Sequence, residues 1–152
     1  MKLHLLEATQ KLPTTIDRAW AFFSDARNLA RITPPSLGFE VTSPLPGRMY
    51  AGMLITYRVR PLFGVAVRWV TEITHVDEPN LFVDEQRFGP YRFWHHQHHF
   101  REIPGGVEVR DMVHYALPPG AGAARWIVAP RLAEIFGYRR EVLEETFGPW
   151  KE

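Results

Sequence analysis

Apolar and polar residues alternate with a period of two from Leu37 to Leu117, and short turns containing Gly or Pro interrupt the alternation. This period is typical of strands that bury one face, and short connections favour antiparallel neighbours. A strand over residues 3–12 precedes this region. The strands predicted within it cover residues 38–44, 52–60, 65–77, 81–88, 91–103 and 106–117.

Two short helices are predicted between the first strand and the others. Thr14 or Thr15 can cap the first helix, and Asp17 follows Thr14 by three residues, as in a capping box. The apolar face of this helix carries Ile16, Trp20 and Phe23. The second begins near Asp25 and ends at Pro34-Pro35, because proline cannot continue the hydrogen-bond ladder.

A long helix is predicted at the C-terminus, from near Pro130 to Gly148-Pro149. Its apolar stripe consists of Leu132, Ile135, Phe136, Val142, Leu143 and Phe147. A curved sheet with one apolar face and a single long helix to cover it forms a two-layer α+β domain. We therefore expect one domain over residues 1–152, with an internal ligand pocket between its layers.

Composition excludes several classes of protein. The net charge of +1 comes without a dense basic patch, so we predict no nucleic-acid partner. The chain has no cysteine, which excludes disulfides, Cys-ligated zinc and thiol nucleophiles. No apolar run approaches the roughly 20 residues of a membrane span, and the N-terminus lacks the apolar block of a signal peptide. We expect a cytoplasmic protein.

Arg139 lies near the centre of the apolar stripe of the last helix. A cation at such a position is costly unless it is paired, reaches solvent or meets an anionic ligand. We favour a structural ion pair, with Asp111 or Asp84 as the partner, and keep direct ligand contact as the alternative.

Four of the seven histidines lie within residues 95–99. Alternate side chains of a strand share a face, so His96 and His98 point the same way as Trp94 and Phe100. The large aromatic residues at both ends of this set favour the inward face. Two histidines are then expected side by side on the concave surface of the sheet.

The neighbouring strands add polar groups to the same interior. Asp111 and Tyr115 alternate with valines on the buried face of the last strand, and an antiparallel neighbour can bring His96 or His98 to Asp111. On the other side, one strand face is predicted to carry Phe82, Asp84, Gln86 and Phe88. An aromatic wall with a polar band is typical of ligand pockets.

Three chemical interpretations of this band remain open. The His-x-His pair with a carboxylate can bind a divalent metal, although two histidines and one acid are a weak signal. His96 or His98 can act as a general acid or base, tuned by Asp111. The interpretation we favour is a hydrogen-bonded polar patch that satisfies buried groups and orients a ligand. No nucleophile motif or Gly-rich phosphate loop is present.

The order of elements resembles the helix-grip fold of the START/Bet v 1-like (SRPBCC) superfamily, in its bacterial polyketide cyclase/dehydrase-like branch. The resemblance spans the chain and rests on Phe82-Val83-Asp84-Glu85-Gln86, Gly89-Pro90-Tyr91, the segment Trp94 to Phe100, the segment Asp111 to Pro118, and Phe136-Gly137-Tyr138-Arg139. It implies a seven-stranded antiparallel sheet that grips the C-terminal helix over a hydrophobic cavity. Members bind lipids, polyketides or similar molecules, and a minority catalyse cyclisation or dehydration.

We therefore predict a protein that binds a small hydrophobic or amphipathic molecule in a cavity of roughly 300–1,000 Å³. No cofactor or metal is predicted. The predicted ligand-binding residues are Phe82, Asp84, Gln86, Trp94, His96, His98, Phe100, Asp111, Tyr115, Phe136 and Arg139. The alternative is a cyclase/dehydratase-type enzyme, with His96, His98, Asp111 and Tyr115 as the catalytic candidates. A third class, a partner-regulating domain, has no sequence feature in its favour.

Overall fold

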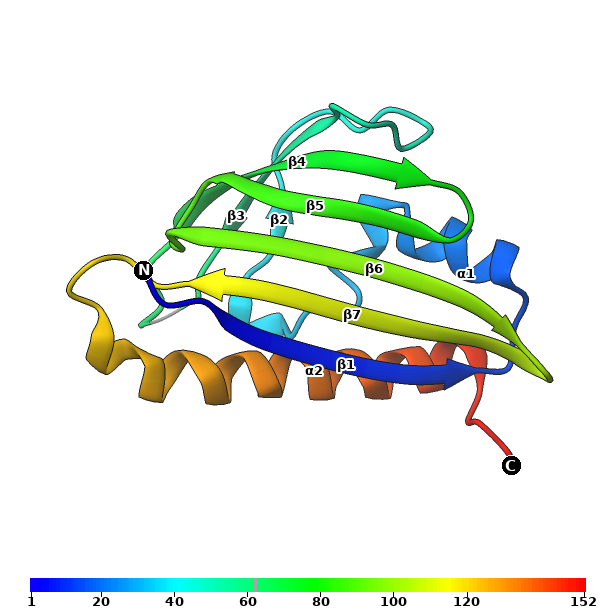
Figure 1. The fold of residues 1–152 in the computed structure, drawn as a ribbon. Helices are drawn as coiled ribbons and strands as arrows, with labels where there is room; N and C mark the ends of the chain where they lie inside the picture. The colour runs from blue at the N-terminus through cyan, green and yellow to red at the C-terminus, as the bar shows by residue number, and fades with distance from the viewer. Residues whose placement is uncertain (62) are drawn as a thin grey trace.

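A computed structural model describes residues 1–61 and 63–152 and places seven strands in one antiparallel sheet (Figure 1). The strands occur in the spatial order β1-β7-β6-β5-β4-β3-β2. Their bounds are β1 His4–Leu12, β2 Glu40–Val41, β3 Leu54–Val59, β4 Val67–Asp77, β5 Leu81–Phe88, β6 Phe93–Ile103 and β7 Gly106–Ala116. The α+β helix-grip architecture predicted from the sequence is confirmed.

Two helical segments follow β1, as predicted. Helix α1 spans Ile16–Phe23, and a single 3₁₀ turn follows at Ala26–Asn28. Thr15 is the N-cap of α1, because its Oγ1 accepts a hydrogen bond from the backbone N–H of Arg18 at 3.2 Å. The capping-box assignment of Thr14 with Asp17 is therefore wrong by one residue. Asp17 lies in the first turn, where a carboxylate still stabilises the helix dipole.

Helix α2, Arg125–Phe147, begins five residues before the predicted start, directly after a 3₁₀ turn at Gly122–Ala124. Pro130 lies inside α2 and not at its first position, so that part of the prediction is wrong. A proline there leaves the carbonyl of Trp126 without its helical donor. Trp126 is itself 72% exposed, so water can supply the missing hydrogen bond on this side of the helix.

The long strands match their predicted ranges within two residues, but the predicted strand 38–44 shrinks to two residues, Glu40–Val41. Gly38 at its start has the left-handed backbone conformation, with φ of 54°. After Val41, the backbone N–H of Thr56 in β3 donates to the side-chain Oγ of Ser43 at 3.0 Å. A side chain thereby replaces the backbone acceptor, and the ladder ends at this edge of the sheet.

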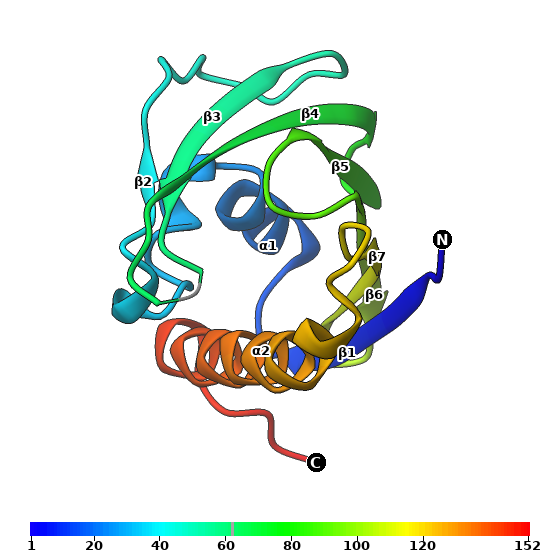
Figure 2. The same ribbon diagram turned by 90° about the vertical axis from the view of Figure 1, so that its left-hand side faces the viewer.

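The sheet curves around α2, and α1 closes one end of the space between them (Figure 2). At that end the Trp20 ring of α1 meets Phe82 and Phe100 edge-on, with centroid separations of 5.6 and 5.5 Å. The apolar side chains of α2 that are buried against the sheet are Val128, Leu132 and Leu143. Within the described residues, no helix combines the length and the apolar character needed to cross a membrane.

Candidate functional site

A cavity of about 200 Å³ lies between the concave face of the sheet and α2. It is smaller than the predicted range of roughly 300–1,000 Å³. A cavity of about 150 Å³ in another protein is known to hold benzene, so this volume matches a molecule of one or two rings. The aromatic residues that line it are Phe22, Phe23, Phe39, Tyr57, Trp69, Phe82, Tyr91, Trp94 and Phe136.

Strand register brings the predicted polar residues together on this face. In the β5–β6 ladder Asp84 lies opposite His96, and in the β6–β7 ladder His98 lies opposite Asp111. Because alternate residues of β6 share a face, both histidines lie between the two carboxylates. All four side chains are at most 17% exposed.

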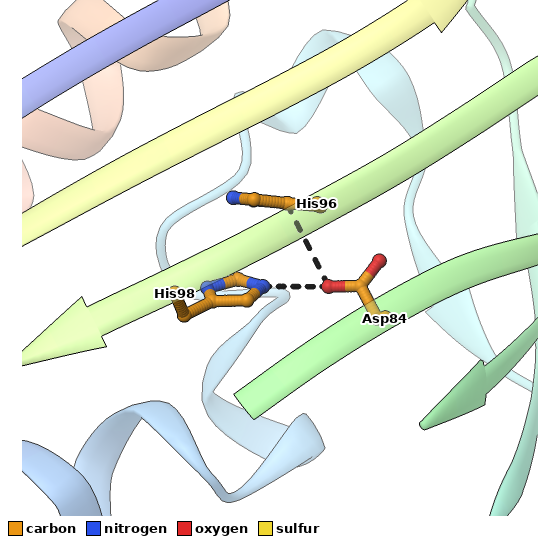
Figure 3. A group of neighbouring side chains, drawn as sticks. All are labelled: Asp84, His96 and His98. Atoms are coloured by element: carbon orange, nitrogen blue, oxygen red, sulfur yellow. Dashed lines mark hydrogen bonds and ion pairs between the residues drawn. The ribbon is translucent and has the colours of Figure 1, made fainter. Parts of the chain in front are cut away.

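Each histidine has a close carboxylate partner. Nε2 of His96 lies 2.8 Å from Asp111 Oδ1, and Nε2 of His98 lies 2.6 Å from Asp84 Oδ2. Nδ1 of His96 lies 3.6 Å from the same oxygen of Asp84, as Figure 3 shows. Both histidine rings therefore share the Asp84 carboxylate, which lies at the cavity wall.

The histidines are also held by stacking. The His98 ring lies between Phe82 and His96, with centroid separations of 4.0 and 3.7 Å and interplanar angles of 14° and 26°. This sandwich restricts the rotation of both imidazoles. The polar cluster is consequently preorganised on the sheet.

Arg139 of α2 joins the cluster from the opposite layer. Its Nη2 lies 3.2 Å from Asp111 Oδ1, and both side chains are less than 10% exposed. The guanidinium also lies over the rings of Phe23 and Phe136, at 5.1 and 5.5 Å. Of the two predicted partners, Asp111 is the one that Arg139 contacts.

The environment separates the pKa values of the two histidines. Burial, together with the neighbouring His98, lowers the pKa of His96 below its ordinary value. Burial acts in the same direction on His98, but the Asp111 and Asp84 carboxylates outweigh it and raise its pKa. The pKa of His98 is therefore the higher of the two, and a proton on the pair is favoured on His98 over His96.

The two carboxylates stay ionised despite their burial. The cationic neighbours Arg139 and the histidines hold the pKa of Asp111 well below its ordinary value, against the effect of burial. His96 and His98 likewise lower the pKa of Asp84. When His98 is protonated, it and Arg139 balance the charges of the two carboxylates.

Most of the residues predicted to bind ligand line the cavity, namely Phe82, Asp84, Trp94, His96, His98, Phe136 and Arg139. Asp111 lies behind the histidines and borders a separate void of about 30 Å³. Phe100 packs in the core against Trp20, and Tyr115 stacks on His4 at 5.2 Å. Neither contributes to the cavity wall as the structure describes it.

Gln86 and Phe88 depart from the expected pocket face. Gln86 holds the β5–β6 turn, because its Nε2 donates to the Tyr91 carbonyl at 2.7 Å and its Oε1 accepts from the Tyr91 N–H at 3.0 Å. Phe88 is 62% exposed, so its predicted place on that face is wrong. A register shift between Val70 and Thr71, opposite this end of β5, breaks the regular alternation.

Asp84, His96 and His98 place one potential metal-ligand atom each within 4.8 Å of one another. The atoms are arranged as a hydrogen-bonded pair, however, since Nε2 of His98 and Oδ2 of Asp84 are 2.6 Å apart. Two ligands of one zinc ion at about 2.0–2.2 Å each lie farther apart than this in tetrahedral geometry. These residues fit a proton-sharing network. A metal ion could bind only if the hydrogen bond between His98 and Asp84 were broken.

Several wall residues were missed by the sequence argument. Tyr57 of β3 and Trp69 and Thr71 of β4 line the cavity, and Trp69 Nε1 donates to Thr71 Oγ1 at 3.1 Å. Trp69 also contacts Trp94 across the wall, at 5.3 Å between centroids. The alternation of residues 52–60 and 65–77 could have placed them on the inner face, but no charged residue adjoins them on that face of either strand to mark it as a site.

The fold recurs in many solved structures, although no family model and no curated protein sequence matches this chain. The chain is similar to TTHA0849 from Thermus thermophilus, with 23% identity, coverage of 93% of this chain and 95% of the other, and a TM-score of 0.68. It is similar to major latex-like protein 151 from Panax ginseng, with 13% identity, coverage of 97% and 99%, and a TM-score of 0.67.

A third similar structure is the ZhuI aromatase/cyclase from Streptomyces sp. R1128, with 11% identity, coverage of 95% and 93%, and a TM-score of 0.72. At these identities the similarity concerns the fold. This chain shares the helix-grip fold of these three structures, the fold that the sequence resemblance implied.

Proposed function

We propose that this protein binds a small hydrophobic or amphipathic molecule in the cavity between the sheet and α2. The observation that carries the proposal is an apolar, aromatic cavity of about 200 Å³ whose wall contains a preorganised cluster of buried charges. Ligand sites combine apolar walls with a few convergent polar groups in this way.

The cost of the charged cluster supports a functional role. Buried ion pairs are often no more stabilising than well-packed apolar residues of similar volume. Here His96, His98, Asp84 and Arg139 all border the cavity, so their polar atoms are placed where a ligand would be oriented. The ZhuI structure, which shares the fold, is described as an aromatase/cyclase, and a cavity for an aromatic molecule agrees with that similarity.

Binding of the neutral two-ring probe 1-naphthylamine, followed by its fluorescence, together with native mass spectrometry of the purified protein, tests the proposal. Ile135 of α2 lines the cavity, so Ile135→Phe should fill it and abolish probe binding. Ala133→Phe adds a larger group to the exposed face of the same helix and should leave binding unchanged. Equal binding by wild type and both variants would show that the probe binds elsewhere and would count against the cavity.

A second candidate function is acid/base chemistry on the bound molecule. It rests on His96, which lines the cavity, has a lowered pKa, is hydrogen-bonded to Asp111 and lies beside Asp84. Tyr115, a catalytic candidate from the sequence, stacks on His4 and does not line the cavity, so it has no part in this mechanism. Mass analysis of a bound molecule before and after incubation tests this function. An unchanged product profile for His96→Ala would rule it out.

A further inference from the structure

Asp84 has one carboxylate oxygen without a protein partner. Its Oδ2 is hydrogen-bonded to His98 Nε2 and lies 3.6 Å from His96 Nδ1, whereas Oδ1 accepts no hydrogen bond from any of residues 1–61 or 63–152. Figure 3 shows this second oxygen turned away from both imidazoles. Asp84 lines the cavity and its side chain is 17% exposed, so a donor on a bound molecule can reach this oxygen.

Asp84 is also the member of the cluster most open to the cavity. Its side chain is 17% exposed, compared with 8% for Arg139 and 9% for Asp111. An occupant of the cavity therefore meets a carboxylate before it meets a cation.

The cationic groups offer the cavity no free donor. Nη2 of Arg139 is directed to Asp111, and Nε2 of His98 is directed to Asp84. Nε of Arg139 and Nδ1 of His98 have no hydrogen-bond partner among the described residues, but both atoms are fully enclosed by protein. An anionic head group would have to displace an internal carboxylate to reach either cation.

Three other polar side chains of the wall already have protein partners. Asp25 accepts from the backbone and side chain of Arg27, and Asn28 donates to the Phe22 carbonyl. Thr71 accepts from Trp69. Of the two carboxylates in the wall, Asp25 is paired with Arg27, whereas Asp84 pairs only with imidazoles within the described chain and keeps Oδ1 as an acceptor among aromatic rings.

We infer that the cavity recognises an uncharged aromatic alcohol of one or two rings, whose hydroxyl donates to Asp84 Oδ1, and that it rejects carboxylates of the same shape. This inference rests on the proposed function and names the ligand class for that cavity. The roughly 200 Å³ volume limits the ring count, and the desolvated negative charge of Asp84 sets the selectivity.

Calorimetric titration at pH 7 with 2-naphthol, 2-methylnaphthalene and 2-naphthoate tests the inference, because the three probes share one shape. Hydrogen bonds to charged groups correspond to about 10- to 100-fold in affinity, so 2-naphthol should bind tighter than 2-methylnaphthalene by that factor. The 2-naphthoate anion should bind weakest. In Asp84→Asn the advantage of 2-naphthol should fall and 2-naphthoate should gain affinity.

Asp25→Asn is the matched control, because Asp25 lines the same cavity but forms an ion pair with Arg27 and is 32% exposed, so that its charge is screened by a cation and by solvent. Its order of affinities should equal that of wild type. Equal binding of 2-naphthol and 2-methylnaphthalene, or tightest binding of 2-naphthoate, would overturn the inferred ligand class and leave the cavity function standing. If none of the three probes bound, both the inferred ligand class and the proposed cavity function would be overturned. The wild-type series decides the question even if Asp84→Asn does not fold.

Discussion

The Asp111 carboxylate in the sheet and the Arg139 guanidinium in α2 form a buried ion pair of 3.2 Å that joins the two layers of the molecule. The same Asp111 oxygen lies 2.8 Å from His96, so one atom connects β7, β6 and α2. Removing a member of such a network leaves the others buried and unpaired.

Arg139→Met should therefore destabilise the protein by about 3–5 kcal/mol, since Asp111 loses its cation in an apolar environment. Arg101→Met is the control, because the Arg101 side chain is 70% exposed and its pair with Glu108 should contribute about 0–1 kcal/mol. Urea unfolding monitored by circular dichroism measures both. Equal midpoints for the two variants would show that Arg139 is not needed to compensate Asp111.

The two histidines should give stability a maximum near their ordinary pKa of 6.5. His98 has a raised pKa, so its contribution is complete below 6.5 and is lost as pH rises through the folded value. His96 has a lowered pKa, so the unfolded chain binds more protons and stability falls as pH drops below 6.5. The ionised Asp84 and Asp111 add a further loss at more acidic pH.

Each flank of this profile can be assigned by mutation. His98→Gln should flatten the decline above pH 6.5, and His96→Asn should flatten the decline just below it. Urea unfolding at a series of pH values gives the profile, and NMR titration of the imidazole carbons gives the two pKa values. A higher pKa for His96 than for His98 in the wild-type protein would contradict the structure.

Removal of α2 should abolish cooperative folding. Its buried Val128, Leu132 and Leu143 each contribute about 1.5–3 kcal/mol, a sum comparable with a typical domain stability of about 5–15 kcal/mol. A chain truncated after Gly122 should lack a cooperative thermal transition, whereas removal of the exposed Lys151 and Glu152 should have no effect. A cooperative transition with retained strand signal in the shorter chain would show that the sheet folds without the helix.

Substitution by alanine should destabilise the protein at Gly106 and stabilise it at Gly137. At Gly106, at the start of β7, a Cβ would lie 2.1 Å from the Leu12 carbonyl oxygen, so the β1–β7 ladder would have to separate. At Gly137, within α2, a Cβ meets nothing within 4 Å, and alanine should stabilise the helix by about 0.5–1 kcal/mol. Thermal melts of the two variants check the prediction. A Gly106→Ala protein as stable as wild type would refute the close approach.

Interior residues on long strands were predictable because strand alternation is a local property. The period of two placed His96, His98 and Asp111 on one surface, and the structure shows them in contact. Arg139 was identifiable because a cation within an apolar helical stripe requires compensation. Pro130 was misplaced by the same local reasoning, since a proline suits both a helix start and an exposed interior position whose carbonyl water can reach.

The sequence by itself determined which side chains share a face, because backbone geometry sets that order within each strand or helix. Tertiary structure alone decided which faces meet and how closely. Register placed Asp84 opposite His96, but the side chains pair diagonally, so that Asp84 bonds His98. The packing of the two layers left Tyr115 outside the cavity and limited the cavity to about 200 Å³. These quantities depend on contacts between residues far apart in the chain, and the alternation pattern of one strand contains no information about its distance from another layer.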